Sequence, residues 1–255
     1  MNPDELKDFM DLKVAQYNQP RFLKDDPLQI PRRFSGKEDI EISGFLTATI
    51  SWGNRRSIIH NAGRMMQLMD MAPFDFVMQH QESDLLTLND FVHRTFNGTD
   101  LVFFIRALKH LYTHKGGLEA VFSGNATAVS TQRAISALKK VFFEIPHPQR
   151  TTKHLPDPAR GSAAKRLNMF LRWMVRDGSA GVDFGIWKQL APSQLSCPLD
   201  VHSGNVARKL GILNRRQNDA RAVEELDMQL RKWDPEDPVR YDFALFGLGV
   251  FENWS

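Results

Sequence analysis

Apolar residues recur every three or four positions along most of the 255-residue chain, and this is the spacing of an amphipathic α-helix. The pattern is clear near the N-terminus, where one face would carry Leu6, Phe9, Met10, Val14 and Tyr17. No segment alternates with the period of two that a half-buried strand requires, and no internal repeat is present. The chain is therefore predicted to be all-α, with about ten helices and short Pro- and Gly-containing connections.

Capping and turn residues divide this pattern into separate helices. Ser35 and Glu38 have the spacing of a capping box before a buried helix, and Asn54 can cap the helix after it. Four prolines between residues 144 and 161 predict a loop. Further helices are expected over 100–112, 127–143, 163–175, the segment after Asp200, 219–233 and the segment from Pro238 onward.

The order of these helices indicates one two-lobed unit. Residues 36–160 are expected to form a central helical lobe. Residues 1–35 and 161–255 together are expected to form a second lobe, which contains the helix that follows Asp200. A chain of this length can bury the core that such an arrangement needs.

The composition excludes several classes of protein. The single cysteine, Cys197, rules out an intrachain disulfide and a site built from several cysteines. A net charge of +3 permits nucleic acid as a partner without requiring it. The sequence has no apolar run of about 18 residues and no signal-peptide pattern, so we expect a cytoplasmic monomer without a membrane span.

The stretch from Pro198 to Gly211 contains most of the chemical information. Pro198 discourages a helix before it, and Asp200 has the position of a helix N-cap. Arg208 and Lys209 follow after two helical turns. Asp200 could act as a cap alone, or it could act beside a polyanion attracted to the helix start. The spacing by itself favours the cap.

Three stretches, taken in order, carry a family resemblance. They are residues 47–56, residues 98–118, and the run from Pro198 to Leu213 that continues through 223–230 to Gly247. Together they resemble the helix-hairpin-helix DNA glycosylases of the endonuclease III-like superfamily, over roughly residues 36–250. The motif Pro-Leu-Asp-x-His is also similar to that of a separate bacterial branch of this superfamily.

This resemblance implies a lysine nucleophile and an assisting aspartate. In the family the lysine attacks the anomeric carbon of a flipped-out nucleotide, and the aspartate stabilises positive charge developing on the sugar. Asp200 matches the aspartate, and Lys165, 35 positions earlier, matches the lysine best. This long gap is similar to that of the archaeal 8-oxoguanine glycosylases. A helix start and the neighbouring Arg160 and Arg166 would favour the neutral amine.

The resemblance also implies residues that contact DNA. Trp52 lies at the turn where the family inserts a side chain into the base stack, and Trp173 and Trp187 could line the pocket of the flipped base. Backbone and side-chain contacts with DNA are expected from Asn54, Arg55, Arg56, Gly161, His202 and Arg208. The alternatives are core positions for the tryptophans and a solvated surface for the basic residues.

Two departures from the family pattern are present. The hairpin glycines are missing from residues 155–161, where only Gly161 could bring backbone N–H groups close to a phosphate. The cysteines that bind an iron–sulfur cluster in some members are also absent. We therefore expect no cofactor and no metal.

The predicted function is cleavage of the N-glycosidic bond of a damaged base in duplex DNA, and a lyase step through a Schiff base on Lys165 stays open. One alternative is a non-catalytic DNA- or RNA-binding protein on the same fold, which the missing glycines favour. Another is a metal-dependent hydrolase that uses His110 and His114, one helical turn apart. The tripeptide from Asp183 to Gly185 matches a kinase motif without its companions, and we interpret it as a chance match.

Overall fold

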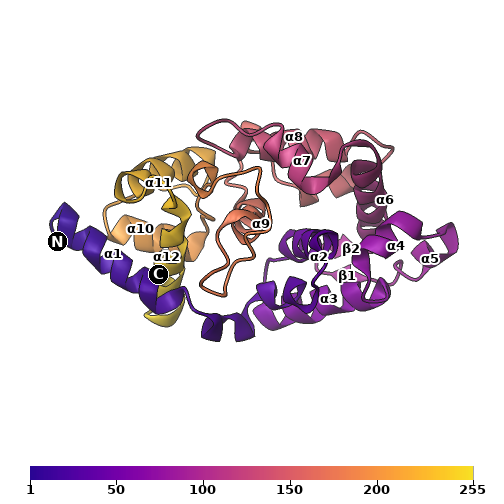
Figure 1. Cartoon of the computed structure of the whole chain (residues 1–255), viewed down its shortest axis with the longest axis horizontal. Coiled ribbons are helices and arrows are strands. Elements are labelled where there is room, and N and C mark those ends of the chain that lie inside the picture. Colours follow the sequence, from indigo (N-terminus) through magenta and orange to yellow (C-terminus); the bar gives the residue numbers. More distant parts are fainter. Residues whose placement is uncertain (255) are drawn as a thin grey trace. The chain divides into compact units, whose positions relative to one another are not determined.

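The computed structural model describes residues 1–254 and confirms the predicted all-α fold (Figure 1). Twelve α-helices and short 3-10 turns make up most of the described chain. A two-stranded hairpin, β1 (Val92–His93) and β2 (Phe96–Asn97), is the exception to the expectation of no strands. Each strand has only two residues, too few for an alternating pattern to be visible in the sequence.

The chain divides into two compact units. Unit 1 comprises residues 1–22, 125–136 and 156–255, and unit 2 comprises residues 23–124 and 137–155. The lobes expected from the sequence, 36–160 against both ends of the chain, have the same general pattern. The boundaries differ: residues 23–35 belong to unit 2, whereas residues 125–136 and 156–160 belong with the chain ends. One helix, α8 (Gln132–Phe142), therefore contributes residues to both units.

Unit 1 contains the first helix and the last four. These are α1 (Pro3–Tyr17), α9 (Lys165–Val175), α10 (Val201–Lys209), α11 (Ala220–Trp233) and α12 (Tyr241–Phe251). Unit 2 contains the helices between them: α2 (Lys37–Thr49), α3 (Arg55–Leu68), α4 (Pro73–Gln79), α5 (Glu82–Leu86), α6 (Gly98–His114) and α7 (Gly117–Ser123).

The predicted caps have mixed outcomes. Asn54 caps α3 as expected, because its side chain accepts a hydrogen bond from the N–H of Ser57. The capping box predicted at Ser35 and Glu38 is wrong. The N-cap of α2 is Gly36, which has no side chain to donate or accept, and Asp39 of the first turn accepts from the N–H of Phe74 instead.

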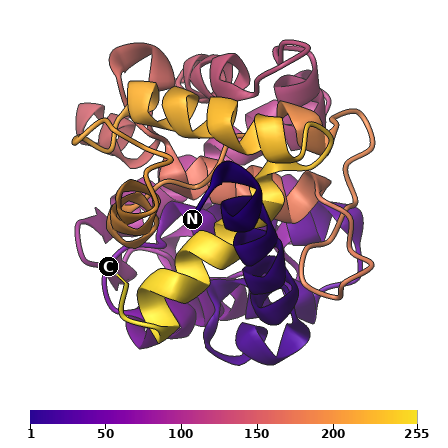
Figure 2. The same ribbon diagram turned by 90° about the vertical axis from the view of Figure 1, so that its left-hand side faces the viewer.

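The two ends of the sequence pack together in unit 1. Figure 2 shows α1 crossing α12, and both helices contribute side chains to one hydrophobic core with α10 and α11. The closest approach is at Gly247, where a Cβ atom would lie 2.2 Å from Cδ2 of Tyr17. The glycine in the last helix therefore has a packing role: it makes room for an aromatic ring of the first helix.

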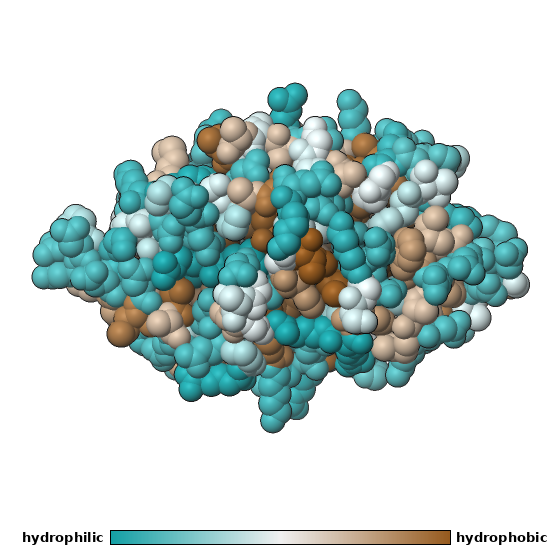
Figure 3. All heavy atoms as spheres, in the orientation of Figure 1, coloured by the Kyte–Doolittle hydropathy of each residue, from teal (hydrophilic) through white to brown (hydrophobic). Residues whose placement is uncertain are grey.

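The surface differs sharply from this interior. Hydrophilic residues cover most of the face seen in Figure 3. Within residues 1–254, no helix combines the length and the apolarity that crossing a membrane requires.

Replacing Gly247 with alanine should destabilise the protein. We expect Gly247→Ala to lower the free energy of unfolding by about 1–3 kcal/mol, because the added methyl group overlaps the Tyr17 ring. Urea denaturation followed by circular dichroism measures this change. Leu12→Ala, on the exposed side of α1, is the control and should change stability by less than about 0.5 kcal/mol. Helix propensity alone would make Gly247→Ala more stable by about 1 kcal/mol. Such a result would contradict the close contact between Gly247 and the Tyr17 ring.

Candidate active site

Lys165 is the first residue of α9 and follows a tight turn. The 3-10 turn Pro158–Arg160 ends at Gly161, which has a φ of +90°. Ser162 then pairs with Asp219 in an isolated antiparallel bridge. Ala164 takes a left-handed conformation with a φ of +47°, which turns the chain into the helix. The Lys165 side chain thus begins at the positive end of a helix dipole.

Asp200 caps α10 and also forms an ion pair with Lys165. It is the N-cap of α10, and its Oδ1 accepts a hydrogen bond from the N–H of Ser203 at 3.0 Å, so the predicted cap is confirmed. Its second oxygen, Oδ2, lies 3.6 Å from Nζ of Lys165. A single carboxylate therefore ends one helix and forms an ion pair with the first residue of another.

The Lys165–Asp200 pair is open to solvent on part of its surface. The Lys165 side chain is 31% exposed and the Asp200 side chain 26% exposed. A small reacting group can therefore reach both. The amine can act as a nucleophile or a proton donor, and the carboxylate can act as a proton acceptor or stabilise a developing positive charge.

A buried network of charges lies along α9 behind this pair. Arg172 forms ion pairs with Asp183 and Asp242, and Arg176 forms ion pairs with Asp183 and Asp237. Arg172 lies in the last turn of α9 and Arg176 is the C-cap residue of this helix, whereas Asp242 belongs to α12. The network therefore ties the helix that carries Lys165 to the last helix of the chain.

Asp242 has the most unusual environment in this region. Burial raises the pKa of its carboxyl to about 6, against the attraction of the Arg172 guanidinium. The charges of Lys165 and Asp200 also act on this carboxyl, the first lowering its pKa and the second raising it. Asp242 can therefore exchange a proton near neutral pH within the field of the exposed pair.

Asp242 and Arg172 were not among the residues predicted from the sequence, and Asp183 was interpreted as part of a chance motif. Arg172 and Asp242 each lie inside an otherwise apolar run of a helix. A charged residue at such a place is expected to be buried with a partner of opposite charge. The sequence could therefore have predicted that these residues are buried, but not which residues they pair with.

Comparison with protein families identifies a match over residues 26–251. The chain belongs to the family described as "Protein of unknown function (DUF2400)". Comparisons with curated proteins and with solved structures gave no match. The matched range includes every residue of the Lys165–Asp200 site and of the network behind it.

Arg208, which is predicted to contact DNA, forms hydrogen bonds within unit 1. In this DUF2400 chain its Nε donates to the carbonyl oxygen of Arg215 at 2.8 Å, and its Nη2 donates to Oδ1 of Asn218 at 2.6 Å. Asn218 in turn donates to the carbonyl oxygen of Asp200. Gly204 permits this approach, because a Cβ there would lie 2.7 Å from Asn218. Arg208 therefore supports the loop that holds the start of α10.

Gly161 and His202 lie on the surface of unit 1. The N–H of Gly161 donates to the carbonyl oxygen of Pro158, and the N–H of Ser162 donates to that of Asp157. These two N–H groups are therefore used within the turn, although Gly161 has open space around it. His202 is exposed on α10, and its Cβ atom and carbonyl oxygen lie close to Gly249 of α12.

Trp173 and Trp187 are core residues. Their exposed fractions are 0% and 1%, and the ring of Trp187 packs edge-on against Phe170. This placement corrects the expectation that they line a base pocket: both large rings are enclosed by the apolar interior of unit 1.

The remaining predicted residues belong to unit 2. Trp52 is half-buried and packs against the rings of His93 and His154, with centroids 5.2 and 6.1 Å away. Arg55 and Arg56 are the first two residues of α3, directly after its cap. Basic side chains at a helix start oppose the helix dipole, and an anion bound there would remove this conflict.

Arg94 is a neighbour of this turn that the sequence analysis did not identify. It has a φ of +55° in the two-residue connection between β1 and β2. Its guanidinium lies over Gly53, where a Cβ would be only 2.4 Å from Nη1. Gly53 is therefore required for this contact and for its own φ of +97°.

The predicted pair of histidines lies at the end of α6. The rings of His110 and His114 are 5.0 Å apart, and Nε2 of His110 is 3.5 Å from a carboxylate oxygen of Glu144. Lys115 pairs with the same carboxylate at 2.8 Å. Among residues 1–254, no group of three or more His, Cys, Asp or Glu side chains could hold a metal ion.

The raised pKa of Asp242 predicts a pH-dependent stability. The carboxyl takes up a proton near pH 6 in the folded chain, and near its ordinary value of 3.8 when unfolded. Between these values the folded state binds more protons, so this group destabilises the fold as the pH rises. We compare the free energies of unfolding of Asp242→Asn and of the unmodified protein. The difference between them should change in favour of the variant by up to about 3 kcal/mol as the pH rises from 4 to 7.

Urea denaturation at several pH values measures this difference, with Asp75→Asn on α4 as the control at an exposed aspartate. A difference between Asp242→Asn and the unmodified protein that does not change with pH would contradict the protonation of Asp242 near neutral pH.

Proposed function

We propose that this protein is a DNA glycosylase that acts on a damaged base in duplex DNA, with Lys165 as the nucleophile and Asp200 as its partner. One observation carries the proposal: an amine and a carboxylate that lie far apart in the sequence form a partly exposed pair at the starts of two helices. The resemblance to the helix-hairpin-helix glycosylases assigns the same roles to these positions. We further propose that the protein acts as a cytoplasmic monomer.

The pair has the chemistry that this reaction needs. Asp200 accepts a proton from the Lys165 ammonium, and the neutral amine then attacks C1′ of the sugar. The bond from C1′ to the base breaks, and the base leaves with the electron pair and takes the proton from the Asp200 carboxyl. As the sugar ring opens, one proton of the amine passes to O4′, which leaves a protonated Schiff base between Nζ and C1′. The regenerated Asp200 carboxylate stabilises its positive charge.

Two further features support this function. The starts of α9 and α10 carry the positive ends of their dipoles, which favour a nearby phosphate group. The buried ion pairs of Arg172 hold α9 against α12, so that the Lys165 backbone is rigidly supported.

The alternative is a nucleic-acid-binding protein without catalysis. The hairpin glycines missing from residues 155–161 favour it, because they depart from the pattern of the catalytic family. Lys165 would then contact a phosphate rather than a sugar carbon. The experiment below separates the two functions.

Lys165→Gln should abolish the formation of a covalent complex with DNA. We expect the unmodified protein, incubated with a duplex that contains one abasic site and then reduced with borohydride, to form a covalent product visible on a denaturing gel. Lys165→Gln should form none, because the Schiff base requires the amine. Lys232→Gln, at an exposed lysine on α11, is the matched control and should retain the product.

The outcomes separate the hypotheses. A covalent product of equal yield with Lys165→Gln would show that another amine reacts. If the unmodified protein binds the duplex in a salt-dependent way but gives no product and releases no base from a panel of lesions, the non-catalytic function is correct.

Asp200→Asn separates the cap from the chemistry. Asparagine caps a helix about as well as aspartate, so we expect the free energy of unfolding to change by less than about 0.5 kcal/mol. The loss of the carboxylate should slow covalent trapping by about 100-fold or more. Thermal denaturation and the trapping rate measure the two effects. An unchanged trapping rate would mean that the carboxylate only caps α10.

A further inference from the structure

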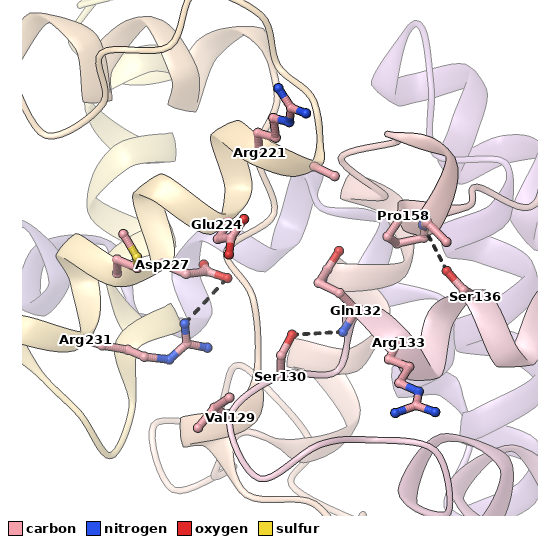
Figure 4. Close-up of a pocket in the computed structure, with 13 residues that line it drawn as sticks. Val129, Ser130, Gln132, Arg133, Ser136, Pro158, Arg221, Glu224, Asp227 and Arg231 are labelled. Carbon is pink, nitrogen blue, oxygen red and sulfur yellow. Dashed lines mark hydrogen bonds and ion pairs between the residues drawn. The ribbon is translucent and has the colours of Figure 1, made fainter.

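A pocket of about 650 Å³ has all of its lining residues within unit 1, and neither Lys165 nor Asp200 is among them (Figure 4). One wall is α11, which contributes Ala220, Arg221, Glu224, Asp227, Met228 and Arg231. The opposite wall is formed by the start of α8 with the loop before it, and by Pro158 and Ala159. None of the residues predicted for catalysis or DNA binding lines this pocket.

Apolar surface continues from the pocket onto the outside of the molecule. Met228 is 58% exposed and Val129 is 68% exposed, and they come from opposite walls. Large apolar side chains exposed at the edge of a pocket are typical of a surface that binds another chain. A small ligand enclosed by the pocket would leave both of these side chains in water.

The charges around the pocket favour an acidic occupant. Asp227 is buried and lies 3.8 Å from Arg231, so these two charges largely neutralise each other. Among the described residues, the guanidinium groups of Arg133 and Arg221 have no ion-pair partner, and both are exposed. Among the lining residues, the only exposed carboxylate is that of Glu224. The uncompensated charge is therefore positive.

The lining argues against nucleic acid as the occupant. None of the pocket residues is aromatic, whereas single-stranded nucleic acid is bound by stacking its bases on aromatic rings. Aliphatic and thioether side chains flanked by arginines instead match a peptide that has an apolar side chain between carboxylates.

We propose that this pocket binds a peptide segment of a partner protein, in which an apolar anchor residue is flanked by Asp or Glu. The apolar anchor contacts Met228 and Val129, and the flanking carboxylates pair with Arg133 and Arg221. The site is independent of the proposed chemistry at Lys165 and gives the protein a second, protein-binding surface.

Phage display on the full chain tests this proposal. Random peptides are selected on the immobilised protein, and the enriched sequences are synthesised with a fluorescein label for polarisation measurements. We expect the enriched peptides to share an apolar residue close to Asp or Glu. Met228→Asp should weaken their binding by at least about tenfold, because it places a charge at the apolar contact.

A charge exchange gives the sharper measurement. Arg221→Glu should lower the affinity for the acidic peptides by about threefold or more. A peptide with lysine in place of the acidic residue should regain affinity for this variant. Leu12→Asp, at an exposed apolar residue of α1, is the matched control and should bind like the unmodified protein. Circular dichroism checks that each variant is folded.

Several outcomes would overturn the proposal: no apolar–acidic consensus among the peptides, equal binding by Met228→Asp, or binding of a single-stranded oligonucleotide that Met228→Asp removes. Lys165→Gln should bind the peptides normally. Retained peptide binding in a protein without trapping activity would therefore overturn only the glycosylase function.

Discussion

The candidate site depends on the ion pairs that Arg172 and Arg176 form inside unit 1. Each arginine meets two aspartates, with Asp183 shared between them. Buried charges lose their hydration, and their attraction offsets this cost only when the partners are well placed. Removing one partner from such a network typically costs about 3–5 kcal/mol, because a charge is left alone in the interior. The network therefore selects one arrangement of α9 and α12.

This constraint has a direct consequence for Lys165. The lysine is the first residue of α9, and the ion pairs of Arg172 and of the C-cap residue Arg176 hold the other end of this helix. Asp200 is held independently, by its cap to Ser203 and by the hydrogen bond from Asn218 to its carbonyl oxygen. Two rigid supports thus bring an amine and a carboxylate together. Such precise support is what a reaction needs and what a chance surface ion pair lacks.

The helices and several of their ends could be predicted from the sequence, since periodicity and caps act over a few residues. Asn54 and Asp200 are examples, because a cap contacts an N–H only three residues away. The capping box at Ser35 failed for the same local reason, because the helix starts one residue later with Gly36 at its cap. The burial of Trp173 and the hydrogen bonds of Arg208 could not be predicted in this way, because the groups they contact are not specified by a local pattern.

The sequence by itself determined the all-α class and the helix that starts after Asp200, and its resemblance to the helix-hairpin-helix glycosylases implied Lys165 and Asp200 as a pair. The tertiary structure alone decided that these side chains lie 3.6 Å apart, and that Asp242 lies buried behind them. The physical reason is the range of the interactions. Helix formation is governed by neighbours along the chain, whereas burial and the pairing of charges depend on segments that only folding brings into contact.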